Sequence, residues 1–143
     1  MTNDATVRLL DLIDASGVPY WVELGISVDS AEEGHVRLRL PMREGLGTRR
    51  PEVMHGGAIG ALIDAAGGAA TATLRRDDDE TWMGQATLDM NATFLNAATS
   101  AVIAEGRVLR SSRALAFISV EVHDEEGTLV AVGRATYTII RKR

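Results

Sequence analysis

One short stretch, residues 54–70, holds the side chains of this sequence that are best suited to chemistry. In MHGGAIGALIDAAGGAA, His55 and two glycines, Gly56 and Gly57, precede an apolar run of small residues that contains a single carboxylate, Asp64. If this run is a helix, its N-terminus presents backbone N–H groups without partners and a partial positive charge. Glycines there let a ligand approach the backbone closely. The pattern predicts a donor site for a carbonyl oxygen that gains negative charge; a tight loop-to-helix turn, with the histidine capping or packing, is the alternative.

The position of Asp64 in the same run raises a second possibility. Asp64 lies nine residues after His55, and at about 100° per residue these steps place it on the side of the helix opposite His55. In one interpretation, Asp64 is a buried carboxylate held by local hydrogen bonds. In the other, it is a general base that serves a second site, across an interface with another copy of the chain. Burial of a carboxylate among leucine, isoleucine and alanine is costly without a partner or a purpose, which favours the second interpretation.

Periodicity predicts the elements that must position these residues. Apolar residues at helical spacing followed by a glycine indicate a short N-terminal helix, and an alanine-rich run without proline indicates a long one. Alternating segments joined by short turns indicate antiparallel strands. A helix that is apolar nearly all round must be wrapped, so we expect an α+β fold in which a curved antiparallel sheet encloses the long helix. The expected helices are residues 2–17 and 57–74, and the expected strands are residues 20–31, 36–42, 82–95, 100–112, 114–126 and 128–141.

Length and composition exclude several classes of protein. A chain of 143 residues fits one domain, which we expect to span 1–143. There is no cysteine, and the three histidines show no metal-ligand spacing, so we expect no disulfide, no metal and no cofactor. The net charge of −5 argues against nucleic-acid binding. No apolar run approaches the ~20 residues of a membrane helix and the N-terminus does not read as a signal peptide, so we expect a cytoplasmic protein that does not insert into membranes.

The same motifs resemble those of a known family. HGGAIGALIDAAGGAA resembles the H-G-G-x-x-x-x-x-x-D signature of hotdog-fold acyl-CoA thioesterases of the PaaI-like family, and ATLDMNATFLNAA resembles the strand that follows it there. SSRALAFISVEVHDEEGTLVAVGRATY resembles the family's last two strands. The resemblance implies the hotdog fold, which is the wrapped helix predicted above. It also implies hydrolysis of an acyl-CoA, aromatic or medium-chain, to free acid and CoA without a cofactor, in a homodimer or homotetramer with sites between protomers.

The resemblance further implies roles for individual residues. The backbone N–H of Gly56, beside Gly57, would polarise the thioester carbonyl. Asp64 of the facing protomer would activate water or attack the carbonyl itself. Thr87 stands at the family's hydroxyl position on the following strand and would orient that water. His55 would hold the loop and contact the thioester.

Two positions depart from the family pattern. Arg49 replaces the usual Asn or Gln six residues before the histidine, and Glu52 replaces the usual glycine three residues before it. Arg49 would still donate to the carbonyl or would point to solvent or to a phosphate, whereas Glu52 would be a replacement carboxylate or an ion-pair partner of Arg49 or Arg50. These departures motivate an alternative function, a hotdog protein that binds acyl-CoA or another thioester without efficient turnover. A hydratase of enoyl thioesters shares the fold and is a third possibility.

A second donor-rich segment contains two arginines. Arg110 and Arg113 flank Ser111 and Ser112, and in the family a basic residue near this position often lies by the nucleotide end of coenzyme A. The guanidinium fork binds two phosphate oxygens at once. A solvated turn is the alternative interpretation.

Overall fold

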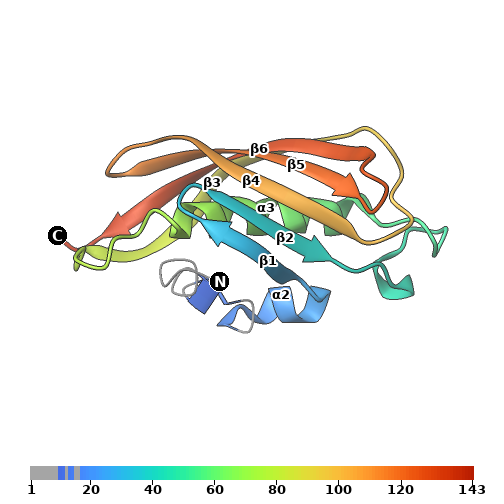
Figure 1. Ribbon diagram of the computed structural model, residues 1–143, viewed down its shortest axis with the longest axis horizontal. Helices are drawn as coiled ribbons and strands as arrows, with labels where there is room; N and C mark the ends of the chain where they lie inside the picture. The colour runs from blue at the N-terminus through green and yellow to red at the C-terminus, as the bar shows by residue number, and fades with distance from the viewer. Residues whose placement is uncertain (1–9, 12, 15–16) are drawn as a thin grey trace.

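The computed structural model describes residues 10, 11, 13, 14 and 17–143 of the chain. A six-stranded antiparallel sheet, in the order β1-β2-β4-β5-β6-β3, curves around one long helix, α3 (Figure 1). This confirms the predicted hotdog architecture. The elements are α2 Pro19–Leu24, β1 Ser27–Glu32, β2 His35–Leu40, the short 3₁₀ helix η2 Glu44–Leu46, α3 Gly56–Ala72, β3 Trp82–Phe94, β4 Val102–Ser111, β5 Leu115–Asp124 and β6 Leu129–Arg141.

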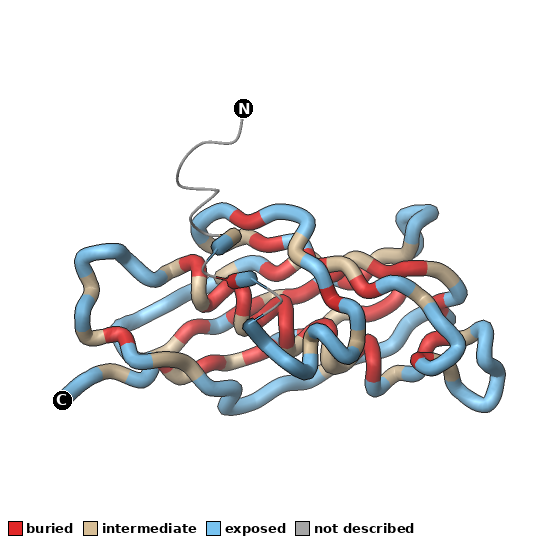
Figure 2. Tube along the Cα trace, turned by 90° about the horizontal axis from the view of Figure 1, so that it is seen from below, coloured by how far each residue is buried: buried red, intermediate tan, exposed pale blue. Residues whose placement is uncertain are grey.

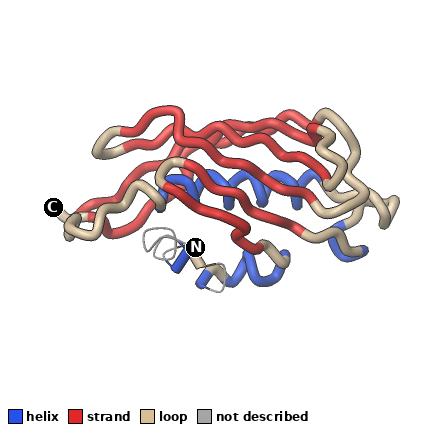
Figure 3. Tube along the Cα trace, in the orientation of Figure 1, coloured by secondary structure: helices blue, strands red, loops and turns tan. Residues whose placement is uncertain are grey.

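The small residues of α3 allow the sheet to close around it. The helix lies along the inner face of the sheet (Figure 3) and packs against β2, β3, β4, β5 and β6. A Cβ added at Gly67 would lie 2.8 Å from the Tyr137 ring and 3.0 Å from the Ala135 Cβ. A Cβ at Gly106, on β4, would lie 2.9 Å from the carbonyl oxygen of Ala66. Glycine therefore serves close helix–sheet packing at these positions.

Alternation along the central strands separates an inner apolar face from an outer polar one. In β5, every second residue from Ala116 to Val122 is buried against α3, and the residues between them are less buried. The strands β2 and β4 repeat this pattern over most of their length. Buried segments therefore gather in the middle of the molecule and exposed ones at its periphery (Figure 2).

The strand β3 does not follow this pattern. It is 13 residues long, lies at one end of the sheet and, among the described residues, pairs only with β6. Along it, four large apolar side chains are exposed by 39% or more: Met83, Leu88, Met90 and Phe94. A long apolar edge strand with unpaired backbone groups is a template for pairing with another chain.

One predicted strand is wrong in its first half. Residues 20–31 were expected to be extended, but Pro19–Leu24 forms the helix α2 and the strand begins only at Ser27. Pro19 occupies the first turn, where its fixed φ suits a helix. Gly25, at φ 86°, ends the helix in the left-handed conformation. Most of the helix expected over residues 2–17 lies outside the described residues, and none of the described helices is long and apolar enough to span a membrane.

Candidate active site

The N-terminus of α3 is capped by the histidine of the HGG motif. His55 is the N-cap residue, with φ −63° and ψ 137°, and its Nδ1 accepts a hydrogen bond from the Gly57 N–H at 2.8 Å. Its own N–H donates to the carbonyl of Leu46 at 2.7 Å. Because Nδ1 accepts, the neutral imidazole carries its proton on Nε2. His55 therefore holds both the loop and the start of the helix by hydrogen bonds.

This cap leaves one backbone N–H group, that of Gly56, without an acceptor in the described part of the chain, at the N-terminus of α3. The carbonyl of His55 accepts from the N–H groups of Ala58 and Ile59, at 3.0 and 3.3 Å. The Gly56 N–H has no acceptor among the residues that the structure describes. It borders a cavity of about 310 Å³ whose lining includes Ile59 and Phe94. The geometry fits a backbone donor for an incoming oxygen.

Midway along α3, Asp64 belongs to a second polar cluster. One carboxylate oxygen, Oδ1, accepts from the Thr87 hydroxyl at 2.8 Å and from the Tyr137 hydroxyl at 2.5 Å. These donors come from β3 and β6, so the bonds are not local. Asp64 itself is half-buried, where the sequence suggested burial. The structure thus brings Thr87 to Asp64, and the expected role of Thr87 in orienting water stays a prediction.

Sequence reasoning missed Tyr137, the third member of this cluster. Burial raises the pKa of its hydroxyl, and the hydrogen bond to Asp64 raises it further, so the group remains a proton donor at any pH near neutrality. Tyr137 lies 73 residues from Asp64. The available signal was a large aromatic residue at an inward position of the last strand, opposite a glycine pair in the helix.

The helix start at Gly56 and the polar cluster around Asp64 lie apart within one chain. Gly56 and Asp64 are eight residues apart in the same helix, which corresponds to ~12 Å along the axis. A reacting carbonyl must lie within about 3–3.5 Å of both the attacking water and its donor. The donor and the carboxylate therefore lie at different points along α3.

Arg49 and Glu52 lie in the exposed loop that leads to α3. Within the described part of the chain, Glu52 makes no ion pair with Arg49 or Arg50, so the ion-pair alternative is wrong and the replacement carboxylate stays a prediction. The turn is stabilised instead by Thr48, whose hydroxyl donates to the Arg50 carbonyl at 3.0 Å.

Arg110 and Arg113 are both exposed, at the end of β4 and in the turn that follows it. The turn is held by Ser112, whose Oγ accepts from the Leu115 N–H at 3.2 Å. The Arg113 carbonyl accepts from Arg141 Nε at 2.7 Å. The side chains of Arg110 and Arg113 are thus available at the surface, and their contact with phosphates stays a prediction.

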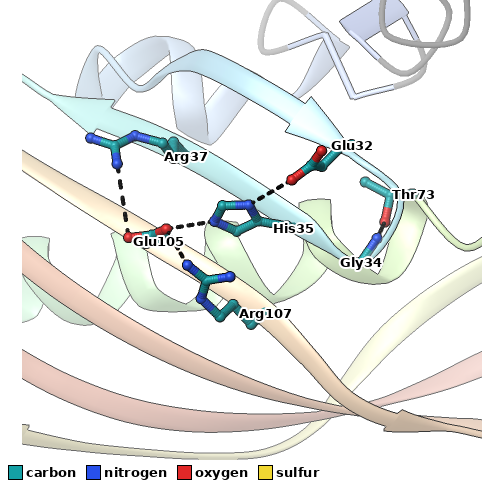
Figure 4. A network of polar contacts seen from close by, with 7 residues as sticks. All are labelled: Glu32, Gly34, His35, Arg37, Thr73, Glu105 and Arg107. Carbon is teal, nitrogen blue, oxygen red and sulfur yellow. Dashed lines mark hydrogen bonds and ion pairs between the residues drawn. The ribbon is translucent and has the colours of Figure 1, made fainter.

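A third polar cluster, on β2 and β4, surrounds Glu105 (Figure 4). Its Oε1 lies 2.6 Å from His35 Nε2 and 2.7 Å from Arg107 Nη2, and its Oε2 lies 3.8 Å from Arg37 Nη1. Burial raises the pKa of this carboxyl, but the His35 hydrogen bond and the attraction of the neighbouring Arg107, His35 and Arg37 side chains outweigh burial and hold the pKa below its ordinary value. The described residues contain no group of three or more side chains arranged to hold a metal ion.

Comparison with known proteins places the chain in a family. The model of the thioesterase superfamily matches residues 52–131. A Halobacterium salinarum protein that carries the name of a candidate esterase is 35% identical, with 97% of this chain and 95% of that protein covered. Among solved structures, a thioesterase-superfamily protein is 32% identical with a TM-score of 0.81, covering 96% of this chain and 99% of that one. The Escherichia coli PaaI protein from the phenylacetic acid degradation operon shares the fold, with a TM-score of 0.82 at 16% identity and 96% coverage of both chains.

Proposed function

The chain belongs to the thioesterase superfamily and is a thioester hydrolase, and we propose that it hydrolyses acyl-CoA in a site that two protomers share. The observation that supports the proposal is that a backbone donor and a carboxylate lie at separate points along α3. An unused N–H group lies at the helix start, on Gly56, and an anchored carboxylate lies ~12 Å further on, at Asp64. These are the donor and the base that thioester hydrolysis needs, separated so that each serves a different site.

In the proposed reaction, Asp64 takes a proton from water as the water oxygen attacks the thioester carbonyl carbon. The carbonyl oxygen gains negative charge and accepts from the Gly56 N–H of the partner protomer. When the carbonyl re-forms, the C–S bond breaks, and the sulfur leaves with the proton that Asp64 took from the water. The products are the free acid and the CoA thiol, and Asp64 is again a carboxylate.

Thr87 fits the proposed water-orienting role in a particular way. Its hydroxyl proton is used in the bond to Asp64 Oδ1. The lone pairs of Thr87 Oγ1 remain able to accept from a water molecule. Thr87 would therefore orient the water by accepting a hydrogen bond from it at Oγ1.

The edge strand β3 supports the pairing of protomers. Its exposed apolar side chains and unpaired backbone groups suit addition of a second β3 strand. Thr87 lies on this edge strand and contacts Asp64, so a partner bound there lies next to the carboxylate. We propose a homodimer built on this edge, either alone or as half of a homotetramer.

A cavity near Asp64 supports an aromatic or medium-chain acyl group. It measures about 250 Å³ and includes Gly68, one helical turn after Asp64, and Gln85. Most of the remaining lining is apolar, contributed by Ile13, Val18, Trp21, Ala69 and Ala72. For the other end of the substrate, we propose that Arg49, Arg110 and Arg113 contact the phosphates of CoA and that Gly57 and Glu52 border the thioester.

Thiol release from a panel of aromatic and aliphatic acyl-CoA esters tests the proposal. The wild-type chain is expected to release CoA from at least one class, and Asp64→Asn to lose that activity. Binding of CoA esters without thiol release across the panel would support the non-catalytic alternative, and hydration of an enoyl-CoA without thiol release would indicate a hydratase. Unchanged turnover in Asp64→Asn would remove Asp64 from the reaction.

A further inference from the structure

The two hydroxyl groups next to Asp64 bind the same carboxylate oxygen. Thr87 Oγ1 and Tyr137 Oη both donate to Oδ1, at 2.8 and 2.5 Å. Within the described part of the chain, no hydrogen bond is directed to Oδ2. The carboxylate is therefore held from one side only.

Tyr137 is fixed more firmly than a surface donor would be. Its side chain is 4% exposed and packs beneath the glycine pair of α3. Its hydroxyl lies 3.4 Å from the position that a Cβ on Gly68 would occupy. It is also within hydrogen-bond distance of the backbone carbonyl of Asp64. The Tyr137 hydroxyl thus contacts both the main chain and the side chain of Asp64. This fixes the orientation of the carboxylate relative to the helix backbone.

From this geometry we propose that Tyr137 is a positioning residue for hydrolysis: together with Thr87 it holds Oδ1 of Asp64, and Oδ2 is the oxygen that takes the proton from water. This inference rests on the proposed function of Asp64. It assigns different roles to the two oxygens of one carboxylate and adds a residue from the last strand to the site.

The chemistry of the donors supports this division. Hydroxyl groups are neutral, so they orient the carboxylate without cancelling its charge. An arginine in their place would neutralise it. Hydrogen bonds from hydroxyls to a carboxylate are charge-assisted and strong. A base that is already aligned avoids the entropic cost of finding the reactive orientation during each turnover.

The test compares Tyr137→Phe with Thr138→Val, a matched removal of a hydroxyl from the next residue of β6, which is only half-buried. Tyr137→Phe keeps the ring that fills the space beneath Gly67 and Gly68. We expect its kcat to fall about 10- to 100-fold, the effect of one hydrogen bond to a charged group, with KM changed less than about twofold. Thr138→Val is expected to retain wild-type kcat, and both variants to keep the wild-type melting temperature within a few degrees.

A double variant separates positioning from a general structural role. In Asp64→Asn, the carboxamide retains Oδ1 as an acceptor but replaces Oδ2 with an NH₂ group. We expect Tyr137→Phe to cause no further loss of kcat in the Asp64→Asn background, because residues that act as a unit are not additive. An additive further loss, a rise in KM with unchanged kcat, or wild-type kcat in Tyr137→Phe would each overturn the inference.

The proposed function and this inference fail in different ways. Full activity of Asp64→Asn contradicts the proposed function. Loss of activity in Asp64→Asn together with wild-type activity in Tyr137→Phe contradicts only the role of Tyr137. Thr87→Val removes the other donor to Oδ1 together with the acceptor proposed for water, so its kcat is expected to fall by at least as much. Wild-type kcat in Thr87→Val would overturn the inference even if Tyr137→Phe does not fold.

Discussion

Two carboxylates of this molecule lie in polar clusters of opposite kinds. Glu105 is surrounded by His35, Arg37 and Arg107, which contact both of its oxygens. Asp64 receives two neutral hydroxyl donors on one oxygen. Cations neutralise a carboxylate and restrict it to a structural role, whereas neutral donors on one side leave its charge and its second oxygen available. The partners of the two carboxylates, more than their burial, therefore distinguish Asp64, the one proposed to do chemistry, from Glu105.

The largest expected difference between the two clusters is in turnover. Asp64→Asn is expected to lower kcat by about 10²- to 10⁴-fold, the usual contribution of a general base. Glu105→Gln is expected to leave kcat within about twofold, because Glu105 belongs to a separate cluster on β2 and β4. Steady-state thiol release from both variants checks this, and comparable losses in the two would remove the distinction between the clusters.

A proline substitution tests the other half of the site. Gly56 is the first residue of α3, where proline is tolerated, and His55, at φ −63° and ψ 137°, has the backbone conformation that a residue before proline adopts. Gly56→Pro removes the N–H and is expected to lower kcat by about 10²- to 10³-fold. Gly56→Ala keeps the N–H, and its Cβ would lie 3.5 Å from the Phe94 ring, an ordinary contact.

Gly56→Ala is the matched control for this substitution. We expect it to retain most of the wild-type kcat, and far-ultraviolet circular dichroism should show the same helix content in both variants. Equal loss of kcat in the alanine and proline variants would show that the side chain, and not the missing donor, causes the defect.

Crowding of the Tyr137 ring is expected to lower kcat by less than the two substitutions above and to lower stability. In Gly67→Ala, the new Cβ would lie 2.8 Å from the Tyr137 ring and 3.0 Å from the Ala135 Cβ. We expect the free energy of unfolding to fall by about 1–3 kcal/mol, as for other overpacked cores, together with a decrease in kcat because the hydroxyl shifts away from Asp64. Gly60→Ala, whose Cβ would meet nothing within 4 Å, is the control, and urea unfolding gives the comparison.

The smallest expected effect is the contribution of Glu105 to the free energy of unfolding, which depends on pH. Because the pKa of Glu105 is lowered from 4.5 in the folded protein, its ionised form stabilises the fold above pH ~4.5, and that contribution is lost as pH falls through the folded-state pKa. Glu105→Gln is expected to cost about 0.5–1 kcal/mol at pH 7 and less at pH 3. Urea unfolding at both pH values checks the sign, and a cost that grows toward acid pH would contradict it.

The sequence predicted the scaffold better than the contacts across it. Alternation and the proline-free alanine-rich run predicted α3 and the strands from β2 to β6, because each pattern is local. The helix Pro19–Leu24 was missed because six residues are too few to show a helical period. Tyr137 was missed because its contact with Asp64 joins residues 73 positions apart. The separation of Gly56 and Asp64 along the helix follows from helix geometry alone, which is why the hypothesis of a shared site could be formed from the sequence.

The central claim is that each site uses Gly56 from one protomer and Asp64 from the other. Co-expression of Asp64→Asn and Gly56→Pro chains with different tags, followed by isolation of the mixed oligomer, tests it most directly. Each isolated mixed dimer has one intact pair among its two sites, so it carries about half of the wild-type number of active sites. The account predicts this recovery of thiol release. Mixed oligomers that are no more active than either parent variant would contradict it.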